Sequence, residues 1–261
     1  MQTLILYNAP QSTCSQRVRF VLHEKRLEFA EQKLDLFSGD QLRAEYLRIN
    51  PNGVVPSLVH RDSAIIDSTV IMEYLNEVFP EPTPLVPNDP SKRAAMRSFM
   101  RYIDEVPTPA VRVPSYNWAF LPHFGDMSEE AFAALAESKP LRKDFLLSMG
   151  RCGFSAPEMD KALKRLRQTV VRMAEVLGTD GRPWLMGADL TLADIAIMPV
   201  VVRMEDLGLN ELWQHLPQIG RWLNALKERP AFSSTFYFGS LLSEKYPDLK
   251  NRRNPLNRIG E

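Results

Sequence analysis

The sequence predicts an α/β unit followed by an all-α domain. Before residue 80, short apolar runs typical of strands alternate with stretches of helical period, in the order β-α-β-α-β-β-α. From residue 91 to residue 245, the convincing periodicity is that of helices alone. The proline-rich residues 81–90 cannot continue a helix and are expected to link the two domains, and residues 246–261 are expected to form a flexible tail.

The first domain begins with a compact apolar run, Thr3–Tyr7, of the length of a buried strand. A polar turn and a helical pattern that includes Leu22 follow. Phe29–Leu36 has the pattern of a second strand, and Gln41–Ile49 that of a short helix that ends before Pro51. Two strands joined through a helix are expected to be parallel, with a right-handed crossover.

Two short apolar runs, Ser57–Val59 and Ala64–Ile66, predict a β-hairpin. Pro56 stands directly before the first run. It has no N–H for a strand ladder, and an X-Pro bond at such a position is a candidate for the cis isomer. We therefore expect the backbone of Val55 to face outward. A polar Asp-Ser-Thr follows the hairpin and opens the next helical run, and helix starts of this kind bind carboxylates.

The second domain contains two clear helical stripes, one that includes Met96 and Ile103 and another over residues 163–177. A third helix is predicted from a capping box, with Thr191 as N-cap and Asp194 three residues later. Between the first two stripes, three prolines are expected to break the helix. The aromatic segment that follows them, within residues 106–157, shows neither a helical nor an alternating period.

Composition excludes several classes of function. Lys+Arg and Asp+Glu are equal at 32 each, so no overall field attracts nucleic acid or an anionic membrane. The chain lacks a long apolar run and its first residues lack the pattern of a signal peptide, so we expect a cytoplasmic protein. Cys14 and Cys152 do not form a Cys-x-x-Cys, which disfavours a disulfide oxidoreductase. The four histidines are scattered, and no metal site is expected.

Several motifs resemble the glutathione transferase superfamily, and together they cover nearly the whole chain. They are Val-Val-Pro before the hairpin, Asp-Ser at a helix start, Gly-Ala-Asp-Leu-Thr-Leu-Ala-Asp-Ile-Ala around the capping box, and Trp-Leu-Asn-Ala-Leu-Lys-Glu-Arg-Pro-Ala-Phe at 222–232. The resemblance implies a thioredoxin-like N-terminal domain, an all-α C-terminal domain, glutathione as co-substrate, no metal, and a homodimer.

The resemblance also assigns roles to the residues of the first domain. Asp67 would meet the ammonium of the γ-glutamyl end of glutathione, and Ser68 its carboxylate. Val55, next to Pro56, would pair through its backbone with the cysteinyl part. Gln41 matches a position where the family often has a histidine or lysine that contacts the glycine carboxylate, and a neutral glutamine would make that contact weaker.

A glutathione enzyme must convert a thiol of pKa near 8.5 into a thiolate, and lowering that pKa by two units takes about 2.7 kcal/mol. One hydroxyl bonded to the anion supplies roughly 1.5–3 kcal/mol. The first helix opens with Ser12, Thr13, Cys14 and Ser15, although such residues also serve merely as caps. The zeta-type transferases favour Ser12, the bacterial hydroquinone dehalogenases favour Cys14 and the β-etherases favour Ser15, so all three stay candidates.

Tyr116, Trp118 and Phe120 are candidates for the wall of a hydrophobic acceptor site, or for ordinary packing between helices. Asn-Trp-Ala-Phe, Met-Ser-Glu-Glu-Ala-Phe and Arg-Cys-Gly-Phe in this region look like the insertion of the β-etherases. That likeness implies glutathione-dependent cleavage of a lignin-derived β-aryl ether. The alternatives are a zeta-type isomerase or a reductive dehalogenase that uses Cys14, and, in another class, a non-catalytic interaction protein.

Overall fold

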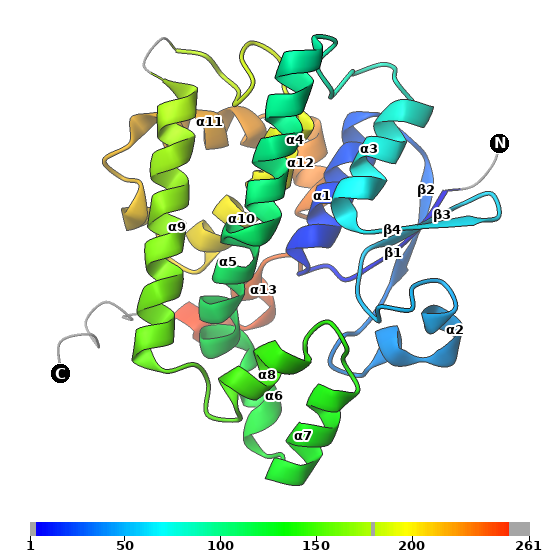
Figure 1. Ribbon diagram of the computed structural model, residues 1–261, viewed down its shortest axis with the longest axis vertical. Coiled ribbons are helices and arrows are strands. Elements are labelled where there is room, and N and C mark those ends of the chain that lie inside the picture. The colour runs from blue at the N-terminus through cyan, green and yellow to red at the C-terminus, as the bar shows by residue number, and fades with distance from the viewer. Residues whose placement is uncertain (1–3, 179–180, 251–261) are drawn as a thin grey trace.

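A computed structural model describes residues 4–178 and 181–250. Its N-terminal part is built on one four-stranded sheet with the strand order β2-β1-β3-β4, in which β1 and β2 are parallel and the other neighbours antiparallel (Figure 1). The strands are β1 Leu4–Asn8, β2 Phe29–Lys33, β3 Ser57–His60 and β4 Ser63–Ile66. The predicted parallel pair and hairpin are therefore confirmed.

Helices α1 (Thr13–Glu24) and α3 (Ser68–Val78) pack against each other between the sheet and the helical domain (Figure 1). The short α2 (Ala44–Leu47) follows a 3-10 turn over Asp40–Leu42. Both β2 and α2 are shorter than the sequence predicts. Residues 34–39 leave the sheet and form a loop whose Asp35 carboxylate accepts hydrogen bonds from the backbone N–H of Phe37 and Ser38.

The second half is all-α within the described residues, apart from one isolated bridge between Trp184 and Gly187. Its helices are α4 Pro90–Glu105, α5 Pro107–Ser115, α6 Pro122–Gly125, α7 Glu129–Glu137, α8 Lys143–Met149, α9 Ala156–Leu177, α10 Leu192–Asp206, α11 Pro217–Lys227, α12 Pro230–Thr235 and α13 Leu242–Lys245. A π-helical turn at Tyr116–Phe120 joins α5 to α6, and 3-10 turns lie at Asn210–Leu212 and Pro247–Lys250.

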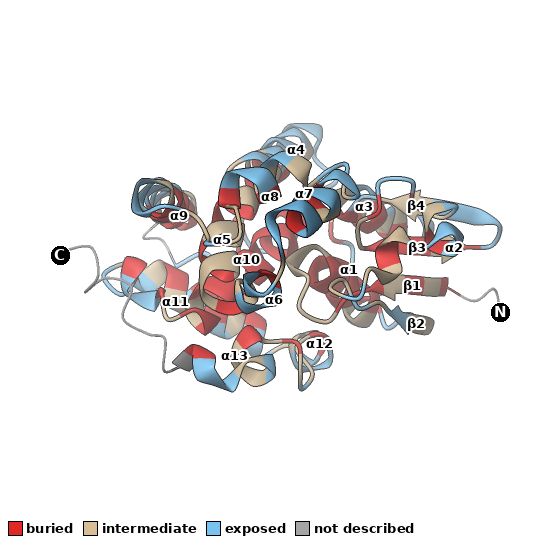
Figure 2. Ribbon diagram, turned by 90° about the horizontal axis from the view of Figure 1, so that it is seen from below, coloured by how far each residue is buried: buried red, intermediate tan, exposed pale blue. Residues whose placement is uncertain are grey.

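The predicted capping box opens α10, which runs through the centre of the molecule (Figure 2). The carboxylate of Asp194 accepts hydrogen bonds from the N–H and hydroxyl of Thr191, each at 3.0 Å. It also accepts the backbone N–H of Leu185 at 2.8 Å and the indole N–H of Trp222 at 2.9 Å. One capping side chain therefore also ties α11 to α10.

The proline-containing segment after α4 is helical, which corrects the expectation of an aperiodic stretch. Helix α4 does end at Glu105, but α5 begins at once with Pro107 as its first residue. Proline is favoured there because the first N–H groups of a helix have no intrahelical partner. Pro114 lies inside α5 next to its last residue, directly before the backbone widens into the π-helical turn.

The expected flexible tail is ordered over its first residues. Leu249 is 3% exposed and packs into the main core, and the hydroxyl of Tyr246 lies 3.0 Å from the ring nitrogen Nε2 of His123. These residues show no apolar period in the sequence, because a single buried leucine creates none. Residues 251–261 lie outside the described part of the chain.

Two hydrophobic cores hold the molecule together. The main core continues from the sheet through α1 and α3 into α4, α9 and α10 (Figure 2). A smaller core lies under α6, α7 and α8 and consists of Phe124, Phe132, Ala136, Leu146 and Met149. Phe37, from the loop after β2, packs against this second core. No helix of the described residues is long and apolar enough to cross a membrane.

Candidate active site

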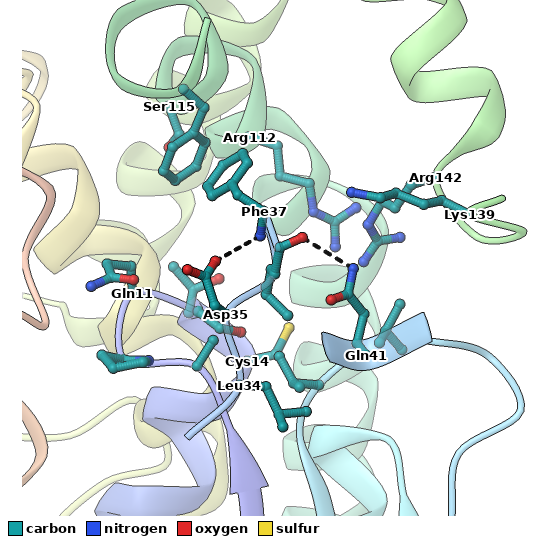
Figure 3. A pocket seen from close by; sticks show the side chains of 18 of the residues that line it. Gln11, Cys14, Leu34, Asp35, Phe37, Gln41, Arg112, Ser115, Lys139 and Arg142 are labelled. Carbon is teal, nitrogen blue, oxygen red and sulfur yellow. Dashed lines mark hydrogen bonds between the residues drawn. The ribbon is translucent and has the colours of Figure 1, made fainter. Parts of the chain in front are cut away.

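A cavity of about 430 Å³ lies between the sheet domain and the helical domain (Figure 3). The sheet domain contributes the turn before α1, the loop after β2 and the turn before β3. The helical domain contributes α5, the π-helical turn and the loop between α7 and α8. A ligand in this cavity would therefore touch both halves of the chain.

The cavity reaches two of the three predicted thiol-activating residues. Ser12 and Cys14 line it, together with Thr13. Ser12 is the N-cap of α1, and its hydroxyl oxygen accepts the backbone N–H of Ser15 at 3.2 Å. Ser15 itself is fully buried, does not line the cavity, and accepts the N–H of Ala9 at 3.3 Å.

The turn before β3 presents a backbone edge to the same cavity. The Val55–Pro56 bond is cis, as the sequence predicts, and Val55 lines the cavity. The carbonyl of Val54 accepts hydrogen bonds from the hydroxyl of Tyr46 at 2.6 Å and from the amide of Asn50 at 2.8 Å, which fixes the turn. Among the described residues, neither backbone group of Val55 has a hydrogen-bond partner, so both can pair with an extended ligand.

Asp67 and Ser68 do not belong to the lining of this cavity. Asp67 caps α3 in a left-handed conformation, with φ of 72°, and one of its carboxylate oxygens accepts the N–H of Thr69 at 2.9 Å. That oxygen makes all the hydrogen bonds found for the carboxylate among the described residues, so the other oxygen faces solvent. Ser68 is buried, and the guanidinium of Arg17 donates to its hydroxyl at 3.2 Å.

Gln41 lines the cavity and is almost fully buried. Its amide nitrogen donates to the carbonyl of Leu36 at 3.2 Å, so the amide orientation is set by that bond (Figure 3). The oxygen Oε1 is buried and has no hydrogen-bond partner. One of the two amide N–H groups of Gln41 is therefore used within the protein, and its neutral side chain adds no charge to the cavity.

The π-helical turn separates the three aromatic residues predicted to form the acceptor wall. Tyr116 and Phe120 both line the cavity and lie four residues apart on the widened turn. Their rings make an edge-to-face contact, with ring centroids 5.1 Å apart. Burial raises the pKa of the Tyr116 phenol, so it stays protonated at neutral pH. Trp118, which lies between them, is half-buried against the main core and does not line the cavity.

Sequence reasoning missed two groups of cavity residues. Phe37 lines the cavity and stacks on the ring of His123, with ring centroids 3.8 Å apart. Arg112, Lys139 and Arg142 point into the cavity from α5 and the α7–α8 loop (Figure 3). Burial and the neighbouring Arg142 lower the pKa of Arg112 to about 10. No local pattern could identify these residues, because they are distant in sequence and meet only after the chain has folded.

The fold is that of a two-domain protein, with a thioredoxin-like domain followed by a helical domain, and the start of α1 lines the cavity between them. A family model described as the N-terminal domain of glutathione S-transferase matches residues 11–78, and one for the C-terminal domain matches residues 127–230. Protein LigF of Sphingobium sp. is 30% identical over 261 residues, which cover 97% of this chain and 98% of LigF. The chain belongs to the glutathione S-transferase family, whose co-substrate is glutathione.

Three further comparisons describe the chain's place in the family. The crystal structure of β-etherase LigF from Sphingobium sp. has a TM-score of 0.81 at 29% identity and covers 90% of this chain and 98% of that chain. Glutathione S-transferase 1 of Dianthus caryophyllus is 50% identical over 93 residues, 36% of this chain and 42% of that protein. FtsZ-localized protein A of Caulobacter vibrioides is 26% identical over 248 residues, 94% of this chain and 92% of that protein.

Metal chemistry was not expected from the scattered histidines. Within residues 4–178 and 181–250, no group of three or more histidine, cysteine, aspartate or glutamate side chains could hold a metal ion. The cavity lining itself offers a thiol, hydroxyl groups, aromatic surfaces and positive charges.

Proposed function

We propose that this enzyme cleaves a β-aryl ether by attack of glutathione thiolate. The observation that carries the proposal is that Tyr116 and Phe120 line the same cavity as Ser12 and Cys14, the residues of the proposed thiol-binding turn. An aromatic acceptor held on that wall would lie beside the glutathione sulfur. The likeness to the β-etherase LigF over nearly the full length of both chains supports the same substrate class.

In the proposed reaction, glutathione lies on the sheet domain, with its cysteinyl backbone paired to Val55 and its ammonium at Asp67. The hydroxyl of Ser12 donates to the sulfur and stabilises the thiolate after the thiol proton has passed to solvent. The sulfur attacks the carbon that carries the aryloxy group, next to a ketone. A carbon–sulfur bond forms, and the carbon–oxygen bond breaks with its electron pair leaving as phenolate. The leaving group needs no strong acid, because phenolate is itself a stabilised anion.

The products that form from a panel of acceptors test this proposal. The panel contains an α-keto β-aryl ether, a chlorohydroquinone and a nitroaryl halide, each incubated with glutathione and analysed by mass spectrometry. Release of the phenol together with a glutathione thioether from the ether is the expected result. Turnover of the nitroaryl halide without cleavage of the ether would show that the enzyme is a transferase of another specificity. It would refute the proposal that a β-aryl ether is the substrate.

A second chemistry is favoured by one observation, the half-buried free thiol of Cys14 in the cavity lining. In a reductive dehalogenase, glutathione thiolate would first replace the chloride of a chlorohydroquinone. The Cys14 thiolate would then attack the sulfur of this conjugate, so that the carbon–sulfur bond breaks, the ring carbon takes up a proton and is reduced, and a mixed disulfide of Cys14 and glutathione remains, visible as a mass increase of the protein. Ether cleavage that persists in Cys14→Ala would assign the main reaction to the glutathione thiolate. Loss of all turnover in this variant, with unchanged glutathione binding, would assign covalent chemistry to Cys14.

A non-catalytic interaction protein is a candidate function outside the enzymes. The likeness to FtsZ-localized protein A, over 94% of this chain and 92% of that protein, is the observation that favours it. The retained hydroxyls of the thiol-binding turn support catalysis instead. We also infer a homodimer and a cytoplasmic location, because both are typical of the family to which the chain belongs. Light scattering coupled to size-exclusion chromatography tests the dimer, since a monomeric mass at micromolar concentration would refute it.

A further inference from the structure

The cavity has a charge that differs from that of the whole protein. The chain has a formal net charge of zero at pH 7. The cavity, in contrast, is lined by six cationic side chains and two carboxylates, namely Lys33, Arg112, Lys139, Arg142, Arg203 and Lys245 against Asp35 and Asp40. A concave site with one sign of charge in excess concentrates ligands of the opposite sign.

Both carboxylates of the lining have partners within the protein. Asp40 forms an ion pair with Arg43 at 2.8 Å and accepts the backbone N–H of Asp35 at 2.8 Å. The carboxylate of Asp35 accepts the N–H groups of Phe37 and Ser38 at 2.9 and 3.2 Å. Neither carboxylate forms an ion pair with Arg112, Lys139 or Arg142.

Three of the six cations also have partners in the fold. Lys33 lies 3.6 Å from the carboxylate of Glu31. Arg203 donates to the hydroxyl of Ser115 at 3.3 Å and to the backbone carbonyl of Gln11, and the carboxylate of Asp206 lies close enough to oppose the lowering of its pKa by burial. Lys245 stands over the ring of Tyr246 and is close enough to Asp35 to lower the pKa of that carboxyl. The uncompensated positive charge therefore belongs to the remaining three.

Arg112, Lys139 and Arg142 direct their cationic groups into one part of the cavity, next to Gln41 (Figure 3). None of the three forms an ion pair with a carboxylate in the described part of the chain, and the hydrogen bond found for Arg142 goes to the adjacent carbonyl of Leu141. Burial lowers the pKa of Lys139 as well as that of Arg112. Partly buried like charges without a counter-ion destabilise one another, and a bound anion would relieve this.

The orientation of Gln41 is an independent observation about the same place. Gln41 is neutral, and one N–H of its amide already donates to the carbonyl of Leu36, so this residue brings no positive charge to a bound carboxylate. Any carboxylate bound beside Gln41 must therefore be held by the cations across from it, on the helical domain.

We propose that Arg112, Lys139 and Arg142 form a carboxylate-binding subsite of the cavity. The two guanidinium groups can each hold a carboxylate through two parallel N–H bonds, and the ammonium of Lys139 adds a third charge. The subsite rests on the proposed function, since its ligand is either glutathione, through the glycine carboxylate, or an aromatic acceptor that carries a carboxylate of its own. In both cases the helical domain, and not residue 41, supplies the charge that selects the ligand.

Calorimetry with two matched ligand pairs tests the subsite without any turnover. The first pair is glutathione and its glycine monoethyl ester, and the second is phenoxyacetate and its methyl ester, added to the glutathione-loaded enzyme. Wild type should bind the acid about tenfold or more tightly than the ester in at least one pair, as expected for charge-assisted hydrogen bonds. The pair that shows the preference identifies the source of the carboxylate.

The variants Arg112→Gln, Lys139→Gln and Arg142→Gln should each reduce that preference, and Arg142→Lys should keep part of it. Arg101→Gln is the matched control, because Arg101 is exposed on α4 and pairs with Glu105 away from the cavity. Circular dichroism melting shows which variants are folded. If Arg112→Gln does not fold, Lys139→Gln, on the loop between α7 and α8, provides the test of the subsite.

Equal binding of acid and ester in both pairs by wild type would overturn the subsite. A preference that survives in the folded variants to the same extent as in Arg101→Gln would overturn it too. The proposed function fails separately, through absence of ether cleavage in an enzyme that still discriminates acid from ester. The two outcomes are therefore read from different experiments.

Discussion

Replacing Asp67 by asparagine, with alanine as the comparison, separates the charge of this residue from its structural role. Asp67 adopts a left-handed φ of 72° and caps α3 through one carboxylate oxygen. Asparagine tolerates both the left-handed conformation and the N-cap position about as well as aspartate does. Asp67→Asn therefore removes little except the negative charge. Asp67→Ala also removes the cap, and it places at positive φ an alanine, which has no polar side chain to form local hydrogen bonds.

The magnitudes follow from these contacts. A charge-assisted hydrogen bond to the glutathione ammonium contributes roughly 1.5–3 kcal/mol. Because Asp67 is exposed, the lower end applies, and the Kd for glutathione should rise about tenfold in both variants. In Asp67→Ala, loss of the cap costs about 1 kcal/mol. The left-handed backbone costs about 1–2 kcal/mol more.

Calorimetry for glutathione and thermal melting on the same two proteins check this reasoning. Asp67→Asn should melt close to wild type, and Asp67→Ala should melt roughly 4–12 °C lower, at about 2–4 °C per kcal/mol for a chain of this size. An unchanged Kd in Asp67→Asn would remove the carboxylate from glutathione binding. Equal melting of the two variants would refute the argument from positive φ and capping.

Three further predictions concern the cavity. Ser12→Ala should raise the pKa of bound glutathione by about 1–2 units, seen as thiolate absorbance across pH, whereas Ser128→Ala, which removes the N-cap of α7 instead, should not. Trp118→Ala should lower the melting temperature, because it removes about 2 kcal/mol of packing, less than the roughly 3–5 kcal/mol lost with a fully buried tryptophan. The acceptor KM should stay unchanged. A raised KM with a normal melting temperature would place Trp118 in the acceptor site. Burial and Lys245 lower the pKa of His123 below its unfolded value near 6.5, so its contribution to stability is present above that pH and is lost as pH falls. His123→Phe should flatten this part of the melting profile, and an unchanged acid slope would exclude His123 as its source.

The sequence by itself determined the elements whose cause is local. The cis bond at Pro56, the cap at Thr191 and the order of strands and helices follow from residues a few positions apart, so their patterns predict them directly. The thiol-binding turn belongs to the same class, because a helix start gathers its polar residues from one short stretch. The strand predicted over Phe29–Leu36 ends at Lys33 in the structure. Its residue pattern does not show where the neighbouring strand β1, which supplies the hydrogen bonds, comes to an end.

The tertiary structure alone decided which of the candidate residues face one cavity. Ser12 and Ser15 are equivalent in sequence, but one turn of helix places the first in the cavity and buries the second. The widened turn directs Tyr116 and Phe120 inward and Trp118 toward the main core, a separation that depends on a backbone irregularity that the residue pattern does not encode.

The uncompensated positive charge is the clearest feature that only folding creates. Arg112 and Arg142 are 30 positions apart in sequence, and neither has a local partner that would mark it. They meet because the second core packs α7 and α8 against the π-helical turn and holds their connecting loop over the cavity. Burial and mutual repulsion, which set the electrostatics of the site, depend on distances through space, and a sequence specifies these only through the completed fold.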